Sequence, residues 1–261
     1  MRIPGRGGAA PVRLTQRCKR QRAGHSPGAA LSGRGGTRAR CCSLAFSPSA
    51  LELGSVRRAH LSGMEPTELI GRPPRDLTAV ATLMRDFPAP WCIAGGWALD
   101  LFLGQLTRAH ADTDLALFRE DQVHLHPHLH GWTFRKVVSG VVMEWHAGEW
   151  LSSPVHEIHA RSPEDPNVTL EFLLNDRVGE QWVFRRDPAI QCPARQVIIG
   201  SAAGLPVLCP AVVLLYKAKQ PRAVDELDFR AARDHLGSER REWLRAALEH
   251  MHPDHPWLNQ L

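Results

Sequence analysis

A glycine pair between two apolar segments constrains the fold of this chain more than any other feature. Residues 91–94 form a short apolar segment, which is typical of a buried strand, and Gly95 and Gly96 follow it directly. The apolar residues 97–103 then end at Gly104, which is typical of a helix that stops at glycine. The chain therefore predicts a strand that turns at glycine into a helix.

Such a turn is suited to binding an anion. Glycine lets backbone N–H groups approach a ligand closely, and the positive end of the helix dipole favours negative charge. A glycine pair alone is weak evidence, because strand-to-helix turns also use glycine for packing. The residues that follow decide the interpretation.

Two aspartates follow the predicted helix. Asp114 opens an apolar segment predicted as a strand over residues 114–118, and Asp112 lies two positions earlier. Side chains two apart on a strand point the same way, so both carboxylates share one face while Leu115 and Leu117 face the core. Adjacent carboxylates repel unless a cation joins them, and Mg²⁺ prefers oxygen ligands together with substrate phosphates. With the glycine turn, the pair predicts a magnesium–nucleotide site rather than a strand cap or a turn.

This part of the sequence resembles a known family. Residues 93–116, IAGGWALDLFLGQLTRAHADTDLA, closely resemble the signature of aminoglycoside 2″-adenylyltransferase-like proteins of the polymerase-β-type nucleotidyltransferase superfamily. The similarity extends over about residues 76–258. It implies that Gly95 and Gly96 hold the triphosphate and that Asp112 and Asp114 bind Mg²⁺. The superfamily usually has serine where this chain and the aminoglycoside branch have Gly96, so phosphate binding here depends on backbone amides.

The superfamily implies a third carboxylate from a neighbouring strand, either completing the metal site or deprotonating the acceptor hydroxyl. Glu171 and Asp176 are the candidates. In the strand predicted at 168–174 the apolar residues alternate, which leaves Glu171 on the opposite face. Asp176 is expected past the strand end as a turn residue. We therefore assign Glu171, with a plain solvent-facing role as the alternative.

The resemblance also implies a lysine that reaches the nucleotide phosphates from the helix predicted to begin at Pro210. Lys217 is the candidate, and an exposed helix cation beside Lys219 is the alternative. Arg108 and His110 precede the aspartates and are included as nucleotide-binding candidates. Arg108 has the alternative of pairing with Asp100.

Composition divides the chain into parts. Residues 1–63 hold 12 Lys/Arg and one acid, whereas residues 64–261 hold 20 Lys/Arg and 26 acids. The first segment lacks a periodic apolar face, so we expect it to be disordered, and its basic charge does not indicate a nucleic-acid partner for the acidic remainder. We interpret this segment as translated sequence upstream of the true start at Met64. A basic arm that contacts RNA and a transit peptide are the alternatives.

The remaining pattern predicts an α+β fold, a nucleotidyltransferase-type mixed β-sheet with flanking helices. We expect a nucleotidyltransferase domain at 64–205 and a helical C-terminal region at 206–261. A helix at about 76–86, with Asp76 as its N-cap, precedes the glycine turn. Further segments fit strands at 132–138, 141–146, 155–159, 168–174 and 182–184, and helices at 211–219, 225–236 and 238–251.

Two other features have ordinary interpretations. His124, His126, His128 and His130 alternate like a metal-binding string, but the stretch contains Pro127 and is expected to be a polar, solvated loop. The tryptophans on predicted strands could line an acceptor pocket, but core packing is the better expectation; they are Trp132, Trp145, Trp150 and Trp182.

The sequence thus predicts a Mg²⁺-dependent enzyme that transfers a nucleoside monophosphate from an NTP, with ATP preferred, to a hydroxyl of a small molecule such as an aminoglycoside-like antibiotic. A catalytically silent nucleotide-binding or toxin–antitoxin-associated protein is the alternative. A glycosyltransferase with an Asp-x-Asp motif is disfavoured, because there the pair follows an apolar strand and here it opens one. Without an apolar run of membrane-spanning length, a signal segment or paired cysteines, a cytoplasmic protein without a membrane partner is expected.

Overall fold

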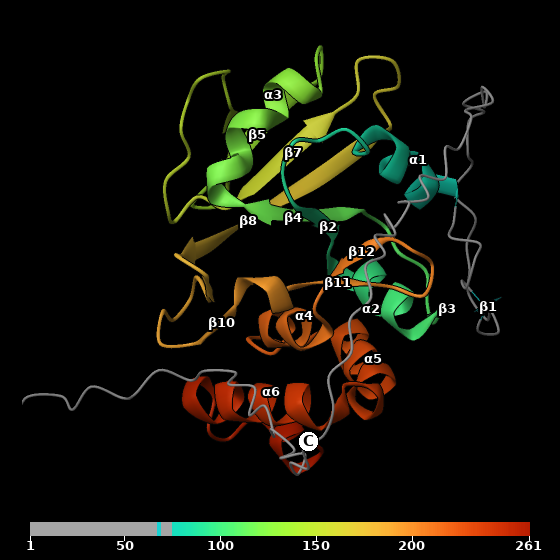
Figure 1. Cartoon of the computed structure of the whole chain (residues 1–261), viewed down its shortest axis with the longest axis vertical. Coiled ribbons are helices and arrows are strands. Elements are labelled where there is room, and N and C mark those ends of the chain that lie inside the picture. Colours follow the sequence, from blue (N-terminus) through green and yellow to red (C-terminus); the bar gives the residue numbers. More distant parts are fainter. Residues whose placement is uncertain (1–66, 69–74) are drawn as a thin grey trace, which may run out of the picture. The chain divides into compact units, whose positions relative to one another are not determined.

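The structure, a computed structural model, describes residues 67–68 and 75–261 (Figure 1). The predictions for residues 1–63 lie outside the described residues. Within those ranges, no helix has the length and apolar character needed to cross a membrane.

Helices and strands are interspersed up to residue 128, strands predominate from residue 133 to residue 208, and helices make up the part that follows. The α-helices are α1 (Arg75–Leu83), α2 (Gly95–Leu103), α3 (Leu125–His128), α4 (Pro210–Lys217), α5 (Ala223–Ala232) and α6 (Gly237–Met251). The short 3-10 helices are η1 (Arg119–His124), η2 (Ala194–Gln196), η3 (Arg233–His235) and η4 (Pro256–Asn259). The strands are β1 (Thr67–Glu68), β2 (Trp91–Ile93), β3 (Gln105–Leu106), β4 (Asp114–Phe118), β5 (Thr133–Val138), β6 (Val141–Glu144), β7 (Glu157–Arg161), β8 (Thr169–Val178), β9 (Gln181–Val183), β10 (Gln191–Pro193), β11 (Ile198–Gly200) and β12 (Pro206–Leu208).

The main sheet is mixed, with the order β11-β12-β2-β4-β8-β7-β5-β6. β4 and β8 run parallel at its centre, and β2 and β7 flank them in the antiparallel sense. The register places Asp114 beside Glu171 and Glu171 beside His159. Three polar residues that are far apart in the sequence therefore lie side by side across three strands.

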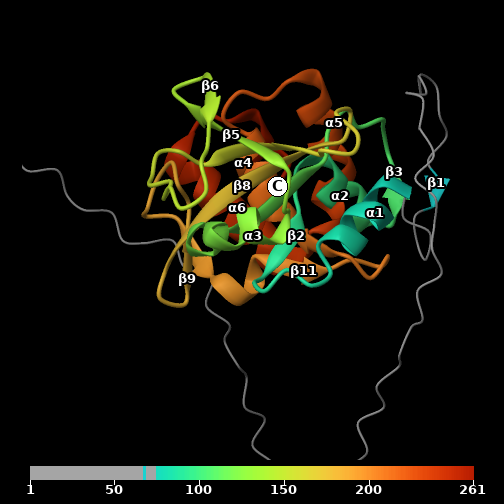
Figure 2. The same ribbon diagram turned by 90° about the horizontal axis from the view of Figure 1, so that it is seen from above.

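Helices cover both faces of the sheet. In Figure 1, α1 and α3 lie above the strands, while α2, α4, α5 and α6 lie below them. The view from above in Figure 2 shows the orange and red C-terminal helices behind the strands, in agreement with this layering. Leu115 and Phe172 are fully buried, as is Leu214 of α4, so strands and helices contribute to one apolar core. Burying these side chains is the main stabilising contribution to the fold.

The α+β prediction is confirmed, but some local predictions are wrong. Asp76 is the second residue of α1 and not its N-cap. Asp112 lies before β4 in an exposed bend and not on the strand. β8 continues through Asp176 because β9 pairs with its second half, an interaction that the alternation along one strand does not show. The short strands β3, β10, β11 and β12 were not expected.

The histidine-rich stretch is helical and not a solvated loop. η1 ends at His124, and α3 contains His126 and His128. Leu125 and Leu129 are buried four residues apart, so this turn of helix is stabilised by docking on the core. Of the tryptophans, Trp145 and Trp182 are in the core as expected; Trp132 is partly buried against it, and Trp150 is half exposed.

Candidate active site

The glycine turn becomes the first turn of α2. Gly95 and Gly96 are its first two residues, and Gly95 has φ of +58°, a conformation that favours glycine. A Cβ atom at Gly95 would overlap the Oδ2 atom of Asp114. One at Gly96 would overlap the side chains of Arg108 and His110. Glycine is therefore required at both positions by the polar side chains that approach the turn.

Acidic side chains converge in front of this turn. Asp114 opens β4 against Gly95, and Glu171 occupies the adjacent position on the parallel strand β8. Asp112 lies in the preceding bend, close enough for its charge to act on both. The structure therefore brings together the three carboxylates predicted from the sequence, although Asp112 reaches the group from a bend.

The three carboxylates are poorly compensated by the protein. Burial, followed by the charges of Asp112 and Glu171, raises the pKa of Asp114 to about 7, while Lys217 opposes this shift. Burial also raises the pKa of Glu171, and the nearby His159 opposes it. Oxygen ligands that repel one another in a half-buried position fit Mg²⁺, whose charge would relieve that repulsion.

Two neighbours of Glu171 on β7 were missed from the sequence. His159 Nε2 lies 2.8 Å from Glu157 Oε1 and 3.9 Å from Glu171 Oε1. Ligand atoms of the three residues lie within 4.8 Å of one another, so within the part of the chain that the structure describes these three, rather than Asp112 and Asp114 with Glu171, have ligand atoms close enough to share a cation as they stand. Glu157 and His159 alternate with the buried Ile158, but the register that sets them beside Glu171 is not visible in either strand alone.

The alternative carboxylate, Asp176, is committed elsewhere. Arg119 donates from Nε and Nη2 to the two Asp176 oxygens at 2.5 and 3.2 Å, and it also donates to the carbonyls of Leu151 and Val155. This ion pair stabilises the junction between β8 and the segment before β7. The geometry therefore favours Glu171 over Asp176 as the third carboxylate.

Lys217, at the end of α4, is not the exposed cation of the alternative interpretation. Its side chain is only 12% exposed, and Nζ lies 2.6 Å from Asp225 and 3.0 Å from Asp228. Burial acts to raise the pKa of Asp225, but hydrogen bonds from Arg222 and Lys217 outweigh it and hold that pKa below its usual range. Lys217 is thus held in place by two buried carboxylates, and its contact with nucleotide phosphates stays a prediction.

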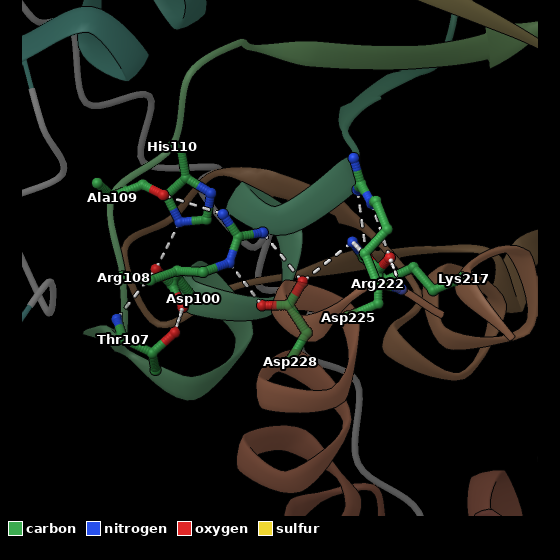
Figure 3. A network of polar contacts seen from close by, with 9 residues as sticks. All are labelled: Asp100, Thr107, Arg108, Ala109, His110, Lys217, Arg222, Asp225 and Asp228. Atoms are coloured by element: carbon green, nitrogen blue, oxygen red, sulfur yellow. Dashed lines mark hydrogen bonds and ion pairs between the residues drawn. The ribbon is translucent and has the colours of Figure 1, made fainter. Parts of the chain in front are cut away.

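Arg108 and His110 also contact acidic side chains of the protein itself, as Figure 3 shows. Arg108 forms a two-point ion pair with Asp228 at 2.8 and 3.0 Å, so the expected alternative of pairing with Asp100 is wrong. Asp100 instead accepts from Thr107 and lies 2.7 Å from His110 Nε2. The nucleotide-binding roles of Arg108 and His110 stay predictions, and both side chains support the glycine turn from behind.

A cleft of about 480 Å³ opens beside Asp114, which lines it, whereas Asp112 and Glu171 are not among its lining residues. Gly95, Asp114 and Glu157 line one part of it, and Lys217 and Arg222 line another. Further basic and aromatic lining residues were not expected from the sequence, because they lie on a turn after β9 and on and beyond α4; they are Arg185, Arg186, Tyr216 and Lys219. The cleft thus combines the carboxylates of Asp114 and Glu157 with cations suited to phosphate.

Comparison with known proteins gives a family match over part of the chain that includes some of the site. Residues 76–148 match the model of the aminoglycoside-2″-adenylyltransferase family, which confirms the resemblance seen in the sequence. This range contains the glycine turn and Asp112 and Asp114, while Glu171 and Lys217 lie beyond it. A search of curated proteins found no match.

Solved structures of two antibiotic adenylyltransferases and of a nucleotidyltransferase-like protein are similar to this chain at low identity. The crystal structure of ANT(2″)-Ia in complex with adenylyl-2″-tobramycin is 19% identical, with a TM-score of 0.47, over 67% of this chain and 95% of that chain. The lincosamide antibiotic adenylyltransferase LnuA, bound to lincomycin, is 14% identical, with a TM-score of 0.43, over 60% and 94%. An antigenic nucleotidyltransferase-like protein from Paracoccidioides brasiliensis is 16% identical, with a TM-score of 0.38, over 73% and 92%.

Proposed function

We propose that this protein is a Mg²⁺-dependent nucleotidyltransferase that moves a nucleoside monophosphate from ATP to a hydroxyl group of a small acceptor. The observation that carries the proposal is the convergence of Asp112, Asp114 and Glu171 on the Gly95 turn, with Lys217 nearby. Carboxylates beside a helix N-terminus and a lysine supply the parts needed to hold a metal–triphosphate complex.

In this reaction the acceptor oxygen forms a bond to the α-phosphorus of the nucleotide, and the bond from that phosphorus to the β-phosphate oxygen breaks. The acceptor proton passes to Glu171, and pyrophosphate leaves. Asp112 and Asp114 would hold Mg²⁺, which when bound neutralises phosphate charge, so that Glu171 is left to accept the proton. Backbone N–H groups of Gly95 and Gly96 would bind the departing phosphates.

The acceptor class rests on the family match. ANT(2″)-Ia and LnuA are described with an aminoglycoside product and a lincosamide, respectively. We propose a hydroxylated antibiotic of this general kind as the first acceptor to test. A function in antibiotic resistance follows only if such an acceptor is modified.

Pyrophosphate release provides the test. The protein is incubated with labelled ATP or other NTPs, Mg²⁺ and a panel of aminoglycosides and lincosamides. We expect Asp112→Asn and Asp114→Asn to abolish release, and Glu171→Gln to reduce kcat by about 100-fold, as expected for loss of a general base. Asp254→Asn, at an exposed position far along the chain, is the matched control.

Release that persists in both aspartate variants would refute the proposed metal site. Nucleotide binding without turnover of any acceptor would instead favour the catalytically silent alternative. Direct binding of Mg·ATP, measured by calorimetry, separates these outcomes from a protein that does not bind nucleotide.

A further inference from the structure

The cleft contains a second polar feature, at the turn that follows β9. Arg185 and Arg186 are consecutive, both are partly buried, and both line the same cleft as Asp114 and Glu157. Their guanidinium carbons lie 5.6 and 5.3 Å from the centre of the Tyr216 ring. Two positive charges are thus held against the same aromatic side chain.

This arrangement is rigid. Tyr216 packs against Phe184 and Trp182, with ring centres 5.0 and 6.4 Å away. Arg186 also donates from Nη1 to the Tyr216 carbonyl at 2.8 Å. The arginines are therefore positioned by α4 and β9, and they need little reordering to receive a ligand.

The two charges lack compensation from the protein. Within the part of the chain that the structure describes, neither guanidinium forms an ion pair with a carboxylate. Asp187, the next residue, instead accepts from the Ala189 N–H and lies 2.9 Å from His250. Burial and the charge of Arg185 lower the pKa of Arg186. Adjacent, partly buried cations without a counter-ion are unfavourable in the free protein and favourable once an anion joins them.

We propose that Arg185 and Arg186, held against Tyr216, form an anion subsite that binds a phosphate-type group of a ligand in the cleft. The inference rests on the proposed function for the identity of the ligand, because the anion belongs either to the nucleotide or to an acceptor that carries a phosphate. Lys219, which lines the same cleft and is exposed, adds a third cation to its rim.

The subsite bears on the class of acceptor. An aminoglycoside is a polycation, and two uncompensated arginines repel it when no anion lies between them. If the nucleotide phosphates occupy the subsite, a cationic acceptor is accommodated. If they do not, the cleft favours an anionic or neutral acceptor.

Calorimetry with inorganic tripolyphosphate tests the subsite without relying on turnover. The full chain is titrated with tripolyphosphate and, separately, with glucose 6-phosphate and glucose. Variants are Arg185→Gln, Arg186→Gln, the double change, and Arg186→Lys, which keeps the charge. Arg195→Gln is the matched control, because Arg195 is exposed on η2 and does not line the cleft.

We expect the Kd for an anion to rise about 10-fold for each arginine removed, in line with the loss of a charged hydrogen bond. Arg186→Lys should retain part of the affinity, and Arg195→Gln should match the wild type. A loss confined to tripolyphosphate assigns the subsite to the nucleotide, and one confined to glucose 6-phosphate assigns it to the acceptor. Unchanged Kd values for both anions in a folded double variant would overturn the proposal.

The proposed function can fail separately. If the wild type binds tripolyphosphate through these arginines but releases no pyrophosphate from ATP with any acceptor, the subsite stands and the nucleotidyltransferase proposal falls. Thermal unfolding of each variant establishes that it is folded. Arg185→Gln is less prone to disturb the fold than Arg186→Gln, because Arg186 donates a hydrogen bond to the Tyr216 carbonyl.

Discussion

At the level of single residues, Asp114 links the stability of the fold to the proposed chemistry. An unfolded chain releases the Asp114 proton near pH 3.8, whereas the folded protein holds it up to a pKa of about 7. Between these values the native state binds the extra proton, so the contribution of Asp114 to the free energy of unfolding falls as pH rises. Above pH 7 the full cost of the buried charge is present.

Replacing Asp114 by a neutral residue should remove this pH-dependent cost. In EDTA at pH 8, Asp114→Asn should raise the free energy of unfolding by about 1–2 kcal/mol while abolishing nucleotidyl transfer, and the gain should disappear near pH 4. Urea unfolding at pH 4, 6 and 8 measures it. Asp112→Asn, at an exposed position, should change stability little. A variant less stable than the wild type at pH 8 would contradict the assigned pKa.

Gly95 gives the second residue-scale prediction. Gly95→Ala places a methyl group where the Asp114 carboxylate lies, at a backbone φ of +58°. Gly140 has a similar φ of +80° with open space around it, so Gly140→Ala imposes the backbone strain alone. Gly140→Ala should destabilise by about 1 kcal/mol and Gly95→Ala by more, and only Gly95→Ala should abolish Mg²⁺-dependent pyrophosphate release. Equal activity losses in the two variants would show that the contact with Asp114 is unimportant.

At the level of elements, Asp228 joins three segments that are distant in the sequence. It lies on α5, receives two hydrogen bonds from Arg108 in the loop after β3, and lies 3.0 Å from Lys217 on α4 (Figure 3). The Asp228 side chain is 2% exposed, so its charge is compensated almost entirely by these two cations. This network positions the glycine-turn side of the cleft relative to the helical side.

Asp228→Asn should therefore lower the free energy of unfolding by about 2–4 kcal/mol, as expected when one partner of a buried ion pair is removed. Asp234→Asn is the control, since Asp234 is 68% exposed and lies 3.7 Å from Arg233. That change should alter stability by less than about 0.5 kcal/mol. Guanidinium unfolding measures both, and similar values for the two variants would contradict a structural role for the network.

The elements also show what the sequence could predict. The strand–glycine–helix unit and β4 were predictable, because residues close in sequence set their apolar periodicity and turn chemistry. Asp176 and the histidine-rich stretch were mispredicted, since β9 extends β8 and the core stabilises α3 through Leu125 and Leu129. Glu171 was predicted as a site residue from the alternation of apolar residues along its strand. His159 could not be predicted, because its place beside Glu171 depends on the register between β7 and β8. The place of Arg185 in the cleft could not be predicted from the sequence, because it depends on the position of α4.

At the level of the whole molecule, the cleft is lined by residues from position 94 to position 225, so a bound ligand bridges the sheet and the C-terminal helices. Its lining carries charges of both signs, including the carboxylate of Asp114 and the guanidinium groups of Arg185 and Arg186. A ligand that carries both a divalent cation and several phosphates complements both kinds of charge. Mg·ATP has this charge pattern, while Mg²⁺ or ATP alone complements only one kind.

The free energy of unfolding should therefore rise more when Mg²⁺ and ATP are both present than with either one alone. At 100 times its Kd, Mg·ATP should raise the free energy of unfolding by about 2.7 kcal/mol, because it binds the folded state alone. Thermal unfolding with Mg²⁺, ATP, and both together measures the effect, and EDTA should reverse it. In Asp112→Asn the Mg²⁺ dependence should weaken, and in Arg185→Gln the ATP dependence should weaken if nucleotide phosphates occupy the anion subsite. If one Mg·ATP complex contacts both Asp112 and Arg185, each variant should reduce the stabilisation by Mg·ATP, and full stabilisation of either variant would argue against such a complex.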